Sequence, residues 1–512
     1  MARMTRRVLV CRAWGNVLRR ACSLIGKCLR RSWNFFLKNK LDLGAELIHG
    51  EQTCLHRLAR ESKWELEEII TLAQGDGGPL PAETNKGFGL FYLGGEKRML
   101  AMDSKDPDFV HLNAYFGSLA NLWPAVKHGA NSRGSKDPAP QSLRDGLKGA
   151  GVTDAMMGVA DAGYANTVGA ALEDVGLLGT CFLEYKWDVD GDRTFVLKGS
   201  FGLFVEELSA GLQSCIKTDW PVAKVDYSTP GRVTVTSKDG KIEEGTEVVC
   251  TLPLTVLQDG DVEFSPLLPK KKLTAFQRMG MCHVVKVILR FEGSVLPPLL
   301  HGCICSESFI PEFWFRHLPN VPEGGYTCLA VGFATGPSAD AVSALKPEEA
   351  LKRALQQLDD MFRGREWLKS ANGCTGKDDW NYQTTTDKLQ PQKAGRILTK
   401  KTYNMPNYES SALPSSSFVD GLVHDWADEP FVRGGYSYPR VDFDENTNAD
   451  AAAVVGGVLF FAGEHTNTPS GMTAHAAVDS GKRAALEVLE SMREARAKGD
   501  KTRSTEATAE AP

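Results

Sequence analysis

One stretch near the carboxyl end of the 512-residue chain constrains the fold most strongly: GVLFFAGEHTNTPSGMTAHAAVDSGKRAALEVL, residues 457–489. Its apolar run at 458–462 predicts a buried strand of the parallel-sheet type. A loop with Ser470 and Gly471 follows, and the next residues predict a helix built from small side chains, which can approach a sheet or a cofactor closely. In open α/β sheets, ligands bind beyond the carboxyl ends of strands and at helix N-termini. The stretch therefore predicts either a ligand-binding corner or a tight structural corner without a ligand.

Elsewhere the sequence mixes helix and strand patterns without strict alternation. Residues 53–72 carry apolar side chains at helical spacing, whereas residues 221–265 and 284–291 show the period-two pattern of strands. Residues 370–418 are mostly polar and predict a surface insertion. Together these patterns predict a fold of α/β plus α+β type with two intertwined domains.

Charge and cysteine content exclude several classes of protein. The net charge is −5, but residues 1–40 hold eleven Lys or Arg and no acidic residue, so the rest of the chain is acidic and not an expected nucleic-acid binder. No run approaches the roughly 18 apolar residues of a transmembrane segment. The 12 cysteines include no CxxC pair, which indicates reduced thiols in an intracellular protein and no metal site.

The basic segment at residues 1–40 allows three interpretations. It has the Arg-rich, acid-poor composition of an organelle presequence. It also has the composition of an amphipathic helix that lies on an anionic membrane. The third interpretation is a misassigned start that replaces the true beginning of the protein. The expected location is the cytoplasm, with organelle import as the alternative.

Five segments, in the same order along the chain, resemble the FAD-dependent amine oxidases, the family of polyamine oxidases, monoamine oxidases and flavin histone demethylases. They are LDLGAELIHG at 41–50, Pro221-Val222 with TLPL at 251–254, the strand GMCHVVKVILRF at 280–291, Trp426 with RGGYS at 433–437, and residues 457–489. The resemblance implies an FAD-binding, Rossmann-like domain and a mixed-sheet substrate domain.

The same resemblance implies domain boundaries. The FAD domain is expected at 41–75, 199–265 and 426–492, and the substrate domain at 76–198 and 266–425. Residues 1–40 lie outside both domains, and residues 493–512 are expected to form a disordered tail.

For the cofactor, the resemblance implies contacts from Gly44, Ala45, Val222, Pro253, Trp426, Gly463, Glu464, Met472 and Thr473. Glu464 is expected to hydrogen-bond the ribityl or pyrophosphate region, while the Met472 and Thr473 amides face the flavin pyrimidine edge. Each residue also has an ordinary structural interpretation. In particular, Glu464 matches a helix cap and Trp426 a packing aromatic residue.

For the chemistry, Lys286 matches the lysine that contacts flavin N5 through a water, and His49 the histidine near the substrate amine. Glu51, Tyr436 and Ser470 are expected to contact the substrate. The alternatives are a solvated surface lysine for Lys286, a core histidine for His49 and a surface acid for Glu51.

The implied reaction is oxidation of an amine, with a polyamine such as spermine or spermidine as substrate. A hydride passes from the carbon next to the amine nitrogen to FAD, the imine hydrolyses, and O2 is reduced to H2O2. A hydrophilic carboxyl end and the IHG at 48–50 favour a polyamine oxidase over its relatives.

Two departures from the family pattern matter. No GxGxxG precedes Gly44, where the only earlier glycines are Gly15 and Gly26. Half of the usual FAD cradle is therefore expected to be missing, and a cofactor-free scaffold protein stays open as the alternative function. The second departure is Ser470, at a position that is aromatic in several family members, which predicts a more polar substrate cavity.

Overall fold

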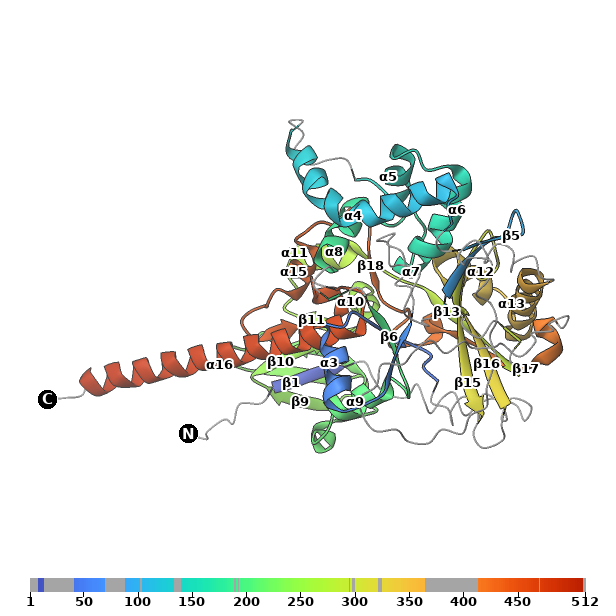
Figure 1. The fold of residues 1–512 in the computed structure, drawn as a ribbon. Helices are drawn as coiled ribbons and strands as arrows, with labels where there is room; N and C mark the ends of the chain where they lie inside the picture. The colour runs from blue at the N-terminus through green and yellow to red at the C-terminus, as the bar shows by residue number, and fades with distance from the viewer. Residues whose placement is uncertain are drawn as a thin grey trace, which may run out of the picture.

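The computed structural model describes residues 8–12, 41–69, 88–101, 104–132, 140–187, 190–191, 193–293, 295–296, 300–320, 325–363, 413–468 and 470–509. Figure 1 shows a body of mixed strands and helices, from which one long helix at the carboxyl end extends. The predicted mixed α/β fold is confirmed. The residues between β1 and Leu41, and most of the polar segment at 370–418, lie outside the described ranges.

A small parallel sheet has the strand order β1-β10-β19. Its strands are β1 (Val8–Arg12), β10 (Glu247–Thr251) and β19 (Leu459–Phe461). Val249 pairs with residues on both neighbours, and β19 is fully buried, as the apolar run predicted. The prediction that residues 1–40 lie outside the domains is wrong for β1, because its backbone completes this sheet. All three strands point their carboxyl ends toward one edge.

Beside it lies a four-stranded sheet in the order β11-β7-β8-β9, which confirms the β-rich segment at 221–265. Its strands are β7 (Val222–Asp226), β8 (Val233–Ser237), β9 (Ile242–Gly245) and β11 (Glu263–Ser265). The helices α10 (Leu254–Gln258), α11 (Lys270–Gln277) and α15 (Thr447–Ala452) belong to the same region. Strands β12 (Met279–Met281) and β18 (Ser437–Pro439) form a separate two-stranded antiparallel sheet, and β12 lies between α11 and β13 in the sequence.

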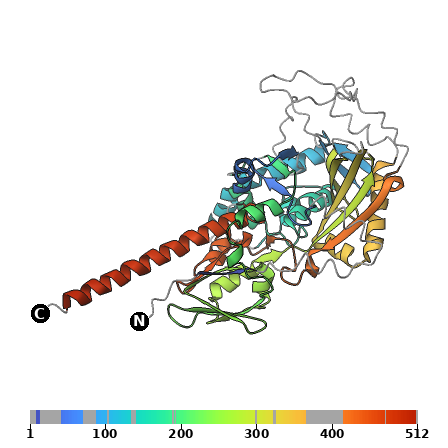
Figure 2. The same ribbon diagram turned by 90° about the horizontal axis from the view of Figure 1, so that it is seen from below.

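The largest sheet has seven strands in the order β17-β13-β16-β15-β14-β4-β5. They are β4 (Phe88–Leu93), β5 (Arg98–Ala101), β13 (Val284–Glu292), β14 (Leu300–Ser306), β15 (Glu312–Asn320), β16 (Gly325–Thr335) and β17 (Phe418–Asp425). Helices α12 (Gly336–Ser343) and α13 (Pro347–Phe362) pack against it. In Figure 2 this sheet and the carboxyl-end helix lie at opposite ends of the body.

A group of helices covers the top of the body in Figure 1. It comprises α4 (Pro107–Ser132), α5 (Leu143–Gly149), α6 (Asp154–Ala160), the π-helical turn η1 (Asp161–Ala165), α7 (Asn166–Val168) and α8 (Leu177–Trp187). The π-helical turn packs against β14, where the side chain of Ile304 lies against Gly163. This turn directs the residue after it, Asn166, into the protein interior.

A further sheet of three strands is formed by segments from the first half of the chain. Strands β2 (Leu47–His49), β6 (Thr194–Leu197) and β3 (Leu66–Ile69) form a sheet that is flanked by α3 (Cys54–Glu61) and α9 (Gly202–Leu208). The prediction of one helix over 53–72 is wrong, because Lys63 takes a positive φ of 59° and β3 pairs with β6. Helix α16 (Ala474–Ala509) begins where predicted but continues through the expected disordered tail. No helix of the described ranges is long and apolar enough to cross a membrane.

Candidate active site

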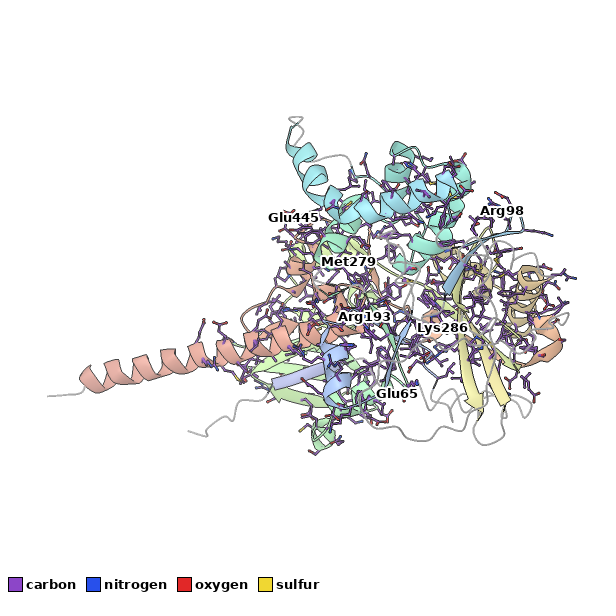
Figure 3. The ribbon with its side chains drawn as sticks, viewed as in Figure 1. Glu65, Arg98, Arg193, Met279, Lys286 and Glu445 are labelled. Carbon is purple, nitrogen blue, oxygen red and sulfur yellow. The ribbon has the colours of Figure 1, made fainter. Side chains whose placement is uncertain are left out.

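Lys286 is buried at the junction of the sheets, with 5% of its surface exposed. Its ammonium Nζ donates to the carbonyl oxygen of Gly44 at 2.8 Å and lies 3.1 Å from Glu46 Oε2. The surface interpretation of Lys286 is therefore wrong. A buried charge needs a partner and hydrogen bonds, and the segment at 41–46 supplies both. Figure 3 shows Lys286 between the seven-stranded sheet and the segment that carries Arg193.

Trp426 holds the same segment from a second side. Its indole Nε1 donates to the carbonyl oxygen of Leu43 at 3.0 Å. A Cβ on Gly44 would lie only 3.2 Å from the Trp426 ring, so a larger residue there would push the two apart. Gly44, Trp426 and Lys286, which are distant in sequence, are thus brought together. The neighbouring Ala45 is exposed.

One row of side chains crosses the seven-stranded sheet. Lys286 pairs with His424 on β17 and with Phe333 on β16, and Phe333 pairs in turn with Glu312 on β15. Residues directly opposite on neighbouring strands share a face. Because strands lie about 4.8 Å apart, Glu312 is roughly 10 Å from Lys286 on the face that carries the lysine. Sequence reasoning missed His424 and Glu312, since only the strand register reveals them.

Glu312 is a buried carboxyl group, 3% exposed. It accepts a hydrogen bond from Asn166 Nδ2 at 3.2 Å, and Asn166 Oδ1 accepts the backbone amide of Thr335 at 2.9 Å. Burial raises the pKa of Glu312 to about 8, because desolvation disfavours the charged form. The group therefore holds its proton over much of the neutral range unless a cation approaches it.

Glu464 follows β19, as predicted, and joins two loops. Its carboxylate accepts the backbone amide and hydroxyl of Ser437, at 3.1 and 2.8 Å, and the amide of Met472 at 3.1 Å. Burial raises its pKa, and the three donors oppose that shift. The Met472 amide is thus engaged by Glu464 rather than left facing a ligand. Thr473 caps α16, because its Oγ1 accepts the amide of Ala476 at 3.1 Å.

Gly463 turns the chain between β19 and Glu464, with a φ of 142°. A Cβ there would lie 2.6 Å from the ring of His465, so only glycine is accommodated. The Gly463 amide donates to Ser480 Oγ at 2.9 Å, and the Gly463 carbonyl oxygen accepts the amide and hydroxyl of Thr466 at 3.0 and 2.8 Å, so this turn is firmly held.

His49 lies at the end of β2, with its ring edge-on to Trp187 at a centroid distance of 6.1 Å. Burial and the nearby His475 lower the pKa of His49 to about 4, so it is neutral at pH 7. Ser470 Oγ donates to Asp190 Oδ2, which also lies 3.3 Å from His475 Nε2. Sequence reasoning missed Asp190 and His475.

The remaining predicted residues, Tyr436, Val222, Pro253 and Glu51, lie on separate parts of the structure. Tyr436 donates its hydroxyl to the carbonyl oxygen of Thr167 at 2.6 Å, and burial raises the pKa of its phenol. Val222 begins β7 and Pro253 caps α10. Glu51 accepts the amide of Arg193 at 3.2 Å and lines a surface hollow of about 380 Å³ that none of the other predicted site residues lines.

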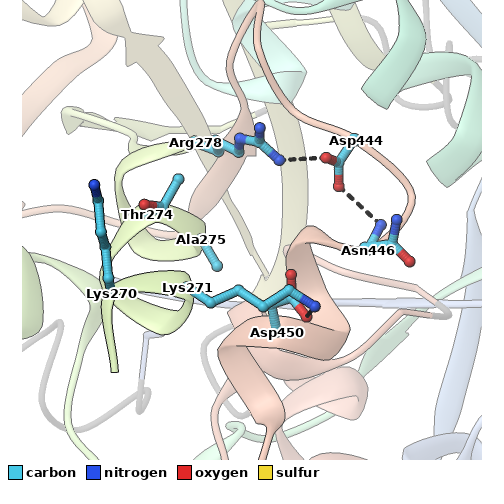
Figure 4. A pocket seen from close by; sticks show the side chains of 8 residues that line it. All are labelled: Lys270, Lys271, Thr274, Ala275, Arg278, Asp444, Asn446 and Asp450. Carbon is cyan, nitrogen blue, oxygen red and sulfur yellow. Dashed lines mark hydrogen bonds and ion pairs between the residues drawn. The ribbon is translucent and has the colours of Figure 1, made fainter. Parts of the chain in front are cut away.

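A hollow of about 450 Å³, shown in Figure 4, lies between α11 and the segment leading into α15. Its charged groups are mostly paired: Lys271 lies 2.8 Å from Asp450, and Arg278 pairs with Asp444. None of the predicted site residues lines it, so it is separate from the site around Lys286. No group of three or more His, Cys, Asp or Glu side chains among the described residues is placed to hold a metal ion.

The sequence model of the flavin-containing amine oxidoreductases matches residues 30–390 and 406–489, which is most of the chain. The chain belongs to this family. Its curated relatives include lysine-specific histone demethylase 1B of Mus musculus, 26% identical over 322 residues, and lysine-specific histone demethylase 1 homolog 1 of Arabidopsis thaliana, 28% identical over 323 residues. The matches cover 62% and 61% of this chain but only 33% and 32% of those relatives, so the chain spans about a third of their length.

Solved structures of similar fold include cyclohexylamine oxidase from Brevibacterium oxydans, with a TM-score of 0.63 and 16% identity. Putrescine oxidase bound to putrescine has a TM-score of 0.62 and 15% identity, and each alignment covers 88% of both chains. At such identities the likeness establishes the fold alone. The family cofactor is FAD, as predicted. The common carboxyl edge of β1, β10 and β19, where ligands bind in open α/β sheets, suits such a group.

Proposed function

We propose that this chain is an FAD-dependent amine oxidase. The observation that carries the proposal is the position of Lys286, whose buried ammonium contacts the Gly44 carbonyl and the Glu46 carboxylate where the family's signature segments meet. Bound FAD supplies the hydride acceptor for oxidation at the carbon next to an amine nitrogen.

The cofactor-binding roles in this proposal follow the segments around Lys286. Gly44, Ala45 and Trp426 line one side, and Gly463, Glu464, Met472 and Thr473 line another. Val222 and Pro253 contact the adenosine end. Because Glu464 already holds the Met472 amide, we assign the pyrimidine edge to Thr473.

His49 and Lys286 have the two proton-handling roles in this proposal. The substrate nitrogen must be neutral to react, and a neutral His49 can accept a hydrogen bond from its N–H. Lys286 Nζ has protons to donate and orients a water near the reacting groups. Tyr436 and Ser470 contribute to the walls of the substrate cavity.

For the substrate we propose a small diamine or polyamine. Glu312 lies roughly 10 Å from Lys286 on the same sheet face, a spacing that suits a second cationic nitrogen several carbons away. An approaching ammonium would also favour the charged form of Glu312. Glu51 offers a second carboxylate nearer the surface, and the acidic body attracts polycations. We place the enzyme in the cytoplasm, which a fluorescent fusion can test.

A second candidate is demethylation of a lysine side chain in a protein, favoured by the names of the curated relatives. An amine panel separates the two. The purified chain is titrated with FAD, and H2O2 is measured with spermine, spermidine, putrescine and an N-methylated lysine peptide. Flavin binding with peroxide from the polyamines supports the proposal, and peroxide from the peptide alone supports demethylation. A folded chain that binds no FAD contradicts both and favours a scaffold.

A further inference from the structure

A buried polar cluster surrounds Asp190, a residue that lies outside the segments that the sequence singled out. Its carboxylate oxygen Oδ2 accepts the hydroxyl of Ser470 and lies 3.3 Å from Nε2 of His475. The Asp190 side chain is 14% exposed, His475 2% and Ser470 3%. A carboxylate in such surroundings is costly unless it is paired, so the positions of its two partners are strongly determined.

The backbone of Asp190 is also fixed to the segment after His49. Its carbonyl oxygen accepts the amide of Gln52 at 3.0 Å, while the amide of Gly50 donates to Arg193 at 2.7 Å. Gly50 has a φ of 90°, and a Cβ there would collide with the Asp190 carbonyl oxygen. The end of β2, and His49 with it, is therefore held at a set distance from Asp190.

The two partners of the carboxylate flank the beginning of α16. Ser470 has a φ of 59°, in the left-handed region, and its hydroxyl bond to Asp190 stabilises that conformation. His475 lies in the first turn of α16, and its carbonyl oxygen accepts the thiol of Cys54 at 3.6 Å. Asp190 thus connects β2, the turn after α8 and the start of α16.

We propose that Asp190 is a positioning residue that fixes His49 against the flavin-binding loop, because its backbone holds the segment after His49 and its carboxylate holds Ser470 at the start of α16. Ser470 Oγ donates to Oδ2, and Nε2 of His475 lies 3.3 Å from the same oxygen, so the carboxylate of Asp190 contacts both the loop before α16 and its first turn. The catalytic consequence rests on the proposed function, but the positioning does not.

The structural part is tested by histidine-selective ¹⁵N NMR of the full chain. The signals of His49 and His475 are assigned by their loss in His49→Gln and His475→Gln. Asp190→Asn is expected to move both signals, because it removes the charge 3.3 Å from His475 and weakens the link from the segment after His49 to Ser470. The matched control is Asp340→Asn, which removes a carboxylate 2.8 Å from His283 and should leave both signals in place. An unchanged His49 signal in Asp190→Asn overturns the proposal, whether or not the protein is active.

The catalytic part is tested by a double-mutant cycle on amine oxidation. Asp190→Asn is expected to lower kcat/KM about tenfold in the native background and less than about twofold in His49→Gln, because it acts through His49. Equal losses in both backgrounds indicate a purely structural role and overturn the proposal. If the native chain oxidises no amine, the proposed function fails, and the NMR result alone decides the positioning.

Discussion

Among the residues that the structure describes, Lys272 and Lys286 are both almost completely buried, but their surroundings differ. Lys286 is 5% exposed and has the Glu46 carboxylate at 3.1 Å. Lys272 is 2% exposed and donates to the carbonyl oxygens of Asp450 and Ala451, at 3.2 and 2.6 Å. Its Nζ lies 3.8 Å from the centre of the Phe461 ring. Burial lowers the pKa of Lys272 to about 7.

The difference shows that burial alone does not identify a functional lysine. Lys272 belongs to the packing of α11 against β19, within the core of the domain that contains the parallel sheet. Lys286 instead connects two separate segments and carries a charge that Glu46 balances. A carboxylate partner at a junction of segments, rather than low exposure, distinguishes the candidate catalytic site from the core.

The largest expected effect is the loss of turnover in Lys286→Met. We expect kcat for the best amine to fall roughly a thousandfold, because the proton donor beside the reacting groups is removed. Steady-state kinetics on protein with matched FAD content measures this. Stability should fall too, since Glu46 is left buried without its partner, at a cost of about 3–5 kcal/mol.

A matched control separates the two effects. Adding Glu46→Gln to Lys286→Met removes the unpaired charge and should restore much of the unfolding free energy without restoring turnover. If turnover returns in the double variant, Lys286 acts only through stability, and the proposed functional difference between Lys286 and Lys272 is contradicted.

Lys272→Met should instead leave turnover intact and change the pH dependence of stability. Between about pH 7 and 10.5 the unfolded chain binds a proton at this site that the folded chain does not, so unfolding free energy rises with pH. The slope is up to about 1.4 kcal/mol per pH unit. Denaturant unfolding of both proteins across this range should show that rise only with Lys272, and parallel curves contradict it.

Glu312→Gln tests the opposite pH dependence, in which the unfolding free energy of the native chain falls as the pH rises. With a pKa of about 8 in the folded chain and 4.5 as the ordinary value, Glu312 contributes stability at low pH that is lost as the pH rises from 4.5 to 8. Glutamine keeps an oxygen for Asn166, so the variant should gain roughly 4 kcal/mol relative to the native chain at pH 8. The KM for diamines should rise about tenfold, and that for monoamines should not. Equal changes for both amines would exclude Glu312 as the partner of the distal nitrogen.

Trp426→Phe is expected to have the smallest effect on stability. It removes the hydrogen bond to Leu43 and should cost about 1 kcal/mol in unfolding free energy. Because the ring beside Gly44 stays aromatic, the flavin spectrum should shift only slightly. A loss of FAD binding would show that the indole contributes far more than this one bond.

Much of the fold could be predicted because its signals are local. The buried strand and small-residue helix around Gly463, and the alternating strand at Lys286, depend on neighbours in sequence. The helix over 53–72 failed, because the pairing of β3 with β6 overrode the helical spacing. The Val-Leu-Val run at the start of β1 was a usable strand signal, but the surrounding basic residues obscured it.

The site itself could be predicted only in part, because its contacts join distant segments. Alternation along β13 made Lys286 look solvent-facing, and nothing in the sequence shows that residues 41–46 cover that face. Asp190 and His475, which lie close together in the fold, are far apart along the chain. Glu312 and His424 enter the site only through strand register.

The most direct test of the account is the visible absorption spectrum of the FAD-loaded native chain under anaerobic conditions, recorded as spermine is added. We predict that the oxidised flavin bands bleach at a rate that Lys286→Met slows and Lys272→Met does not. Bleaching that both variants slow equally, or that neither slows, would contradict the distinction between the two lysines on which the proposed site depends.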